Sequence, residues 1–122
     1  QGINVKKMTI EEFYKELDSD YDEVLSRLAK ASLIERLVKL YRRDENYKLL
    51  CMGIAEKDRE KAFTASHTMK GLALNLGFKE LSRTSTELCE AMRNSYADNA
   101  QELFDAVKKE QEQILKLIDQ LN

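Results

Sequence analysis

The length, composition and charge of the chain restrict it to a few classes of protein. Its 122 residues are enough for one hydrophobic core and too few for a core with a separate catalytic domain. The net charge of -2 gives no overall basic field that would attract nucleic acid or an anionic membrane surface, and the apolar runs are too short to cross a bilayer. We therefore expect one domain over residues 1–122, monomeric and cytoplasmic, in which Gln1 and Gly2 are a cloning remnant.

The spacing of the apolar residues predicts an all-α fold. The chain has no Pro and only four Gly, so the residues that usually punctuate strands and tight turns are rare. Apolar residues recur at intervals of three and four, which is typical of amphipathic helices. The expected helices span residues 9–18, 21–30, 32–43, 45–56, 58–76, 78–94 and 98–121. The pattern leaves open whether the third and fourth segments are two helices or one bent helix.

Polar residues mark the starts of most of these helices. Two segments begin with the spacing of a capping box, in which a hydroxyl and a carboxylate each bind a free amide of the first turn: Thr9 with Glu12, and Ser32 with Glu35. An aspartate precedes four other segments and can cap them: Asp20, Asp44, Asp58 and Asp98.

The loops between the last four segments predict the architecture. These loops are short, so the segments can pair as antiparallel neighbours in an up-and-down four-helix bundle. We expect the core of this bundle within about residues 32–121, with the two short N-terminal helices covering one end. Gly77 follows a periodic stretch where a left-handed residue is wanted, so residues 58–76 and 78–94 should form a helical hairpin.

Neither the cysteines nor the histidine indicates a metal site. Cys51 and Cys89 are far apart in sequence, and with a single histidine they do not make a credible zinc set. We expect both thiols to be reduced, buried as small apolar side chains, and we expect no cofactor.

His67, the only histidine, is the candidate functional residue. A helix turns ~100° per residue, which places the core stripe of residues 58–76 in one arc and His67 almost opposite its centre. That stripe consists of Ala62, Ala65, Met69, Leu72, Ala73 and Leu76. His67 is therefore expected to face solvent.

The neighbours of His67 on this outer face are an unusual combination. Lys70 and Gly71 lie one turn later, and Phe63 and Leu74 are apolar residues on the same side, with Thr64 beside them. A glycine inside a helix costs up to ~1 kcal/mol relative to alanine, and clearance for a docking partner would compensate for it. Phe63 and Leu74 could instead pack under the N-terminal helices, and a helical histidine is often only a solvated surface residue.

The chemistry of this face is that of phosphoryl transfer. An imidazole can attack an acyl phosphate and later return the phosphoryl group to another carboxylate. Lys70 would offset charge on the phosphoryl oxygens. The second ring nitrogen needs a partner, and across the Gly77 turn the candidates near residues 84–89 are Thr84, Ser85 and Glu87.

The sequence around His67 resembles the signature of histidine-containing phosphotransfer (HPt) domains. That signature reads H-x-x-K-G, then a short apolar stretch, then L-G and a leucine; here these are His67, Lys70, Gly71, Leu76-Gly77 and Leu81. The likeness covers nearly the whole chain, including Tyr21 to Leu28 and Tyr47 to Leu50. One departure is Cys89, which stands where many members have a glutamate; Glu90 follows it.

The resemblance implies a phosphorelay intermediate without its own kinase activity. His67 would accept phosphate from the aspartate of a response-regulator receiver domain, or of a hybrid histidine kinase that carries one, and Lys70 would assist. Phe63, Thr64, Gly71 and Leu74 would form the docking surface, and magnesium would belong to the receiver. Two alternatives stay open: a non-catalytic helical adaptor that binds a partner by the same face, and the phosphoacceptor domain of a chemotaxis-type histidine kinase.

Overall fold

The structure is a computed structural model that describes residues 7–122, and within this range its regular structure is helical. The proposed cloning remnant, Gln1 and Gly2, lies outside the described residues. All seven expected helices are present, and their observed bounds are α1 (Ile10–Glu16), α2 (Tyr21–Leu28), α3 (Ala31–Tyr41), α4 (Asn46–Glu56), α5 (Arg59–Leu76), α6 (Lys79–Ala91) and α7 (Ala100–Ile118).

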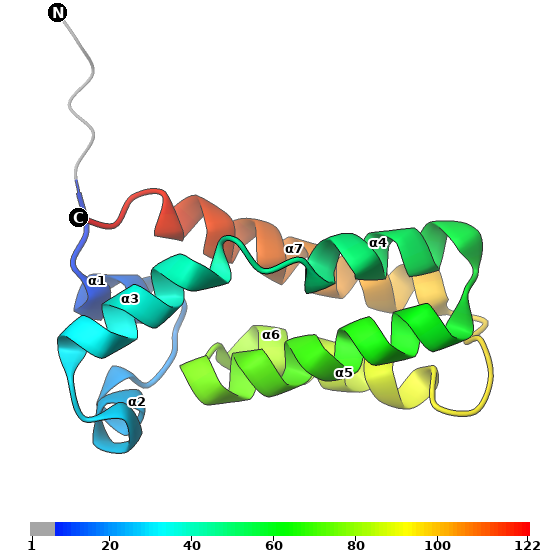
Figure 1. Ribbon diagram of the computed structural model, residues 1–122, viewed down its shortest axis with the longest axis horizontal. Coiled ribbons are helices and arrows are strands. Elements are labelled where there is room, and N and C mark those ends of the chain that lie inside the picture. The colour runs from blue at the N-terminus through cyan, green and yellow to red at the C-terminus, as the bar shows by residue number, and fades with distance from the viewer. Residues whose placement is uncertain (1–6) are drawn as a thin grey trace, which may run out of the picture.

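The predicted bundle is confirmed. Helices α4, α5, α6 and α7 lie side by side and alternate in direction, and α1, α2 and α3 gather at one end of the bundle (Figure 1). Helices α3 and α4 follow one another along the same edge, but residues 42–45 separate them, so they are two helices rather than one bent helix. The two ends of the described chain meet where the Met8 amide donates to the Gln120 carbonyl at 2.7 Å.

Three of the predicted helix caps are confirmed. Thr9 and Glu12 form the expected capping box of α1. The side chains of Asp20 and Asp58 accept hydrogen bonds from the third amide of α2 and of α5, at 3.1 Å in both cases. These bonds satisfy backbone donors that the first helical turn leaves free.

The other predicted caps need correction. Ser32 lies inside α3, which begins at Ala31 after an uncapped Lys30, so the capping box with Glu35 is wrong. Asp98 is also wrong, because Asn99 is the residue that precedes α7 and it makes no side-chain cap. Asp44 lies two residues before the first residue of α4 and accepts from the Asn46 amide at 2.9 Å, although Glu45 occupies the cap position.

An aromatic cluster joins the N-terminal helices to the end of the bundle. The rings of Phe13 and Tyr14 from α1 and Tyr41 from α3 meet Phe78, with centroids 5.4–6.3 Å apart. The Tyr14 hydroxyl donates to the Leu76 carbonyl at 2.6 Å, which satisfies an acceptor at the end of α5. Burial raises the pKa of the Tyr14 phenol, so this group stays a neutral donor.

Gly77 ends α5 as the sequence predicts. Its φ of 74° is left-handed, and the Phe78 amide donates back to the Ala73 carbonyl at 2.8 Å, as in a Schellman motif. A Cβ at Gly77 would overlap Val24 of α2, so the position requires glycine for packing as well as for conformation. At the preceding turn, between α4 and α5, the non-glycine residue Lys57 adopts a left-handed conformation (φ 55°).

The cysteines differ in burial. Cys89 is buried as expected, whereas Cys51 is only half-buried, and both thiols are free. Among residues 7–122, no cluster of His, Cys, Asp or Glu side chains could hold a metal ion, and each helix is too short or too polar to cross a membrane.

Gly53 sets how closely α4 approaches α5. A Cβ placed on Gly53 would lie 2.8 Å from the Ala62 amide nitrogen and 3.1 Å from the Ala62 Cα. Ala62 is itself fully buried, and its contact with Gly53 is made by backbone atoms, which cannot move aside as a flexible side chain can.

We predict that Gly53→Ala destabilises the bundle. Overpacking costs ~1–3 kcal/mol, and the better helix propensity of alanine returns ~0.5–1 kcal/mol, so the free energy of unfolding should fall by ~0.5–2 kcal/mol. Urea unfolding followed by circular dichroism measures this difference. A variant as stable as the original chain would contradict the close approach of α4 and α5.

Candidate functional site

The register of α5 places His67 on the outside of the bundle. Five of the six residues expected in the core stripe are buried, and the sixth, Leu72, is half-buried. His67 is exposed on the opposite side of the helix, as predicted. Asp58 begins the helix and Gly77 ends it, so both ends that define this register are fixed by local structure.

The imidazole of His67 contacts Phe63, one turn earlier on α5. Their ring centroids are 5.9 Å apart at an interplanar angle of 43°, within the range of favourable aromatic pairs. Long side chains on a helix point back toward its N-terminus, which is why a histidine meets the residue four positions before it. Phe63 is half-buried beside the end of α6, so it does not pack under the N-terminal helices.

Two guanidinium groups flank the Phe63 ring. Those of Arg59 and Arg93 lie 5.9 and 5.3 Å from its centroid, which is the distance of cation–π interactions. Arg59 also donates to the carbonyls of Met92 and Arg93 at 2.8 and 3.0 Å, and thereby satisfies the C-terminal end of α6.

Glu90 is a charged neighbour of His67 that the sequence analysis did not assign to the site. Its carboxylate accepts two hydrogen bonds from the Arg93 guanidinium, at 2.6 and 3.2 Å. These bonds lower the pKa of Glu90, and the nearby charges of Lys70 and His67 act in the same direction. The sequence analysis looked for partners of His67 near residues 84–89, and Glu90 lies one position beyond that range.

None of the three candidates for orienting His67 serves that purpose in the structure. The Thr84 hydroxyl donates to the carbonyls of Glu80 and Leu81, and Glu87 pairs with Arg83. The Ser85 hydroxyl is fully buried and has no hydrogen-bond partner among residues 7–122. Within residues 7–122 the contact that holds the His67 ring is the one with Phe63.

The C-terminal half of α5 presents an open surface. A Cβ on Gly71 would meet nothing within 4 Å, so this glycine is not required by packing inside the protein. Leu74, three residues later, is 59% exposed, the largest value among the exposed large apolar side chains. Arg27 of α2 donates to the backbone carbonyls of Leu74 and Asn75, but the Leu74 side chain stays uncovered. Thr64 and Thr68 are exposed on the same helix.

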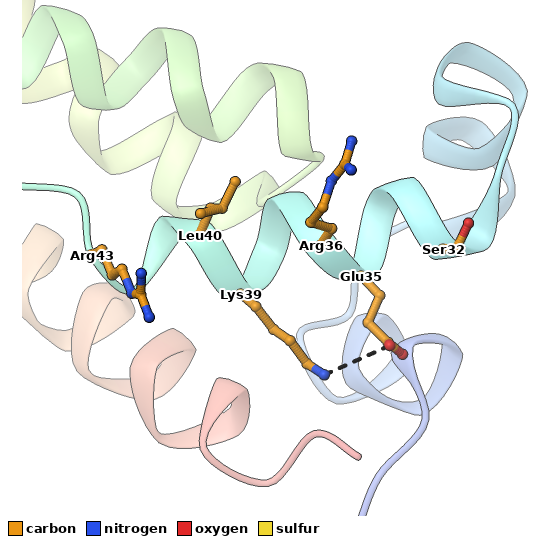
Figure 2. A pocket seen from close by; sticks show the side chains of 6 residues that line it. All are labelled: Ser32, Glu35, Arg36, Lys39, Leu40 and Arg43. Atoms are coloured by element: carbon orange, nitrogen blue, oxygen red, sulfur yellow. Dashed lines mark ion pairs between the residues drawn. The ribbon is translucent and has the colours of Figure 1, made fainter.

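The hollows on α3 are separate from these residues. The larger has a volume of about 330 Å³ and lies along the outer face of α3, where Glu35 and Lys39 pair at 3.6 Å (Figure 2). Its lining contains none of the expected site residues. A second, of about 250 Å³, lies between α3 and the end of α5, where Leu40, Leu72 and Leu76 contribute apolar walls.

The comparison with known families decides the classification. The model of the Hpt domain matches residues 10–122, nearly the whole chain. The chain belongs to the Hpt domain family. Hpt domains take part in phosphotransfer in two-component signalling, and the family interacts with response-regulator receiver domains. Neither the curated proteins nor the solved structures gave a match.

The open space at Gly71 of this Hpt domain gives a direct prediction. Because its Cβ would meet no neighbour, Gly71→Ala should raise the free energy of unfolding by ~0.5–1 kcal/mol through helix propensity alone. Urea unfolding tests this, with Gly53→Ala as the matched variant of opposite sign. A loss of stability in Gly71→Ala would show that the glycine serves the fold.

Proposed function

We propose that this Hpt domain is a phosphorelay intermediate in which His67 accepts a phosphoryl group from a receiver aspartate and passes it on. The observation that carries the proposal is the outward position of His67 on α5, beside Lys70 and a glycine that the fold does not need. A buried histidine could not reach the aspartate of another protein, whereas an exposed one can.

The transfer step needs only the imidazole and its neighbours on this chain. A ring nitrogen of His67 attacks phosphorus, the bond to the aspartyl oxygen breaks, and the aspartate leaves as a carboxylate while a ring proton passes to solvent. Lys70 is half-buried one turn after His67 on α5, and the charges of both side chains act on Glu90, so the Lys70 ammonium can offset charge on the phosphoryl oxygens. The reverse steps return the group to another aspartate.

The partner is proposed to dock over the outer face of α5, on both sides of His67. Thr64, Gly71 and Leu74 supply an exposed hydroxyl, open space and an exposed apolar side chain, and Phe63 borders them. Any magnesium would lie in the receiver rather than on this chain. A receiver on a separate response regulator or on a hybrid histidine kinase would fit equally, and we keep the monomeric and cytoplasmic state as predictions.

We predict that His67→Gln abolishes phosphoryl uptake and leaves the fold intact, because the side chain is exposed and makes no core contact. The assay charges receiver domains with acetyl phosphate, adds the Hpt domain and measures the acid-labile, base-stable label on it. Circular dichroism of the variant is the control. If His67→Gln still acquires an acid-labile, base-stable label, a residue other than His67 accepts the phosphoryl group and the proposal is wrong.

The same assay separates the proposed relay from its two rivals. A non-catalytic adaptor would bind receivers without transfer. The phosphoacceptor of a chemotaxis-type kinase would take phosphate from an ATP-dependent kinase domain. Transfer from a receiver to His67 is the outcome that the relay predicts.

We predict that Gly71→Gln weakens receiver docking by steric blockage. Calorimetric titration of a receiver domain that phosphorylates the original chain should show a higher Kd for the glutamine variant and a nearly unchanged Kd for Gly71→Ala, whose side chain is one methyl group. Equal Kd values for the original chain and Gly71→Gln would contradict the role of Gly71 as clearance.

A further inference from the structure

The His67 ring is held from one side by an aromatic ring rather than by a hydrogen bond. The Phe63 centroid is 5.9 Å from that of His67, and neither nitrogen of the imidazole is bonded to a residue in the described range 7–122. Both nitrogens are therefore available, one to attack and the other to exchange a proton with solvent, provided that something else limits rotation of the ring.

Phe63 is itself contacted by two arginines, Arg59 at the start of α5 and Arg93 just after the end of α6. The guanidiniums of Arg59 and Arg93 flank its ring at 5.9 and 5.3 Å. Each is tethered in turn, Arg59 by the carbonyls of Met92 and Arg93 and Arg93 by the Glu90 carboxylate. A ring flanked in this way has little freedom to move, so it can serve as a rigid surface for its neighbour.

We propose that Phe63, which both Arg59 and Arg93 contact, is a positioning residue that sets the plane of the His67 imidazole for in-line attack on the phosphoryl group. The inference rests on the proposed function of His67 and adds to it. The rate of transfer depends on how often the nucleophile is held in an attacking geometry. Phe63 then acts mainly on the rate of transfer in the complex, and less on the affinity for the receiver.

The kinetic test compares Phe63→Leu with Phe63→Tyr. Leucine keeps an apolar side chain but removes the ring, whereas tyrosine keeps the ring. With a receiver domain that phosphorylates the original chain, we expect the saturating transfer rate of Phe63→Leu to fall about two- to tenfold, the range that an aromatic pair supplies. The saturating rate of Phe63→Tyr should stay near that of the original chain. The control Leu49→Ala, which truncates an exposed apolar side chain on α4, should also leave this rate unchanged.

A spectroscopic test needs no partner protein. His67 is the only histidine, so its two carbon-bound ring protons are assigned without ambiguity in an NMR spectrum. At a fixed pH, Phe63→Leu should move both resonances toward the positions of free imidazole, and Phe63→Tyr should keep them near those of the original chain. Circular dichroism confirms that each variant is folded.

The outcomes distinguish this inference from the proposed function. An unchanged saturating rate in Phe63→Leu, or a rise only in the half-saturating receiver concentration, would overturn the positioning role while the relay itself stands. If the original chain takes no phosphoryl group from receivers, the proposed function fails, and unmoved His67 resonances in Phe63→Leu would then overturn the contact as well.

Discussion

The rotational position of α5 is the constraint on which the site depends. Near its start, Ala62 packs against Gly53 so closely that a single Cβ on Gly53 would collide with the Ala62 backbone. At its end, the left-handed Gly77 lies under Val24 where no side chain would fit. Helix packing without voids leaves little room for rotation between two such contacts. His67 faces solvent because these two points place Ala62, Met69 and Ala73 in the core.

Three arginines connect neighbouring helices on the exposed face. Arg59 and Arg93 connect α5 to the C-terminal end of α6, and Arg27 connects α2 to the C-terminal end of α5. Arg59 and Arg27 hydrogen-bond to carbonyls that a helix end leaves without partners, so they also stabilise the helix ends, whereas Arg93 donates to the Glu90 carboxylate and contacts the Phe63 ring. Between them lies the open part of α5 with Gly71 and Leu74. Tethered helix ends with an open surface between them fit the docking role that we propose for this face.

The places where sequence reasoning failed have different physical causes. Ser32 and Asp98 have the residue types and spacing of caps, yet α3 begins one residue earlier and Asn99 precedes α7, because packing against neighbouring helices overrides a cap worth ~1 kcal/mol. Thr84 and Ser85 were candidates for orienting His67, but both are buried between helices. Glu90 was overlooked because a hairpin register counted from sequence is uncertain by about one residue, enough to change which side chain reaches across.

The helices, the bundle, the hairpin at Gly77 and the outward position of His67 with Lys70 and Gly71 could all be predicted from the sequence. These follow from a 3.6-residue period and from backbone conformations, which are local properties. The surroundings of the imidazole depend on tertiary contacts. They are the contacts of Arg59 and Arg93 with Phe63, the approach of Glu90, and the open space at Gly71. The contact of Arg93 with Phe63 and the approach of Glu90 to His67 join side chains that lie more than 20 residues apart in the sequence. Their geometry depends on how two helices are rotated against each other, which no local pattern encodes.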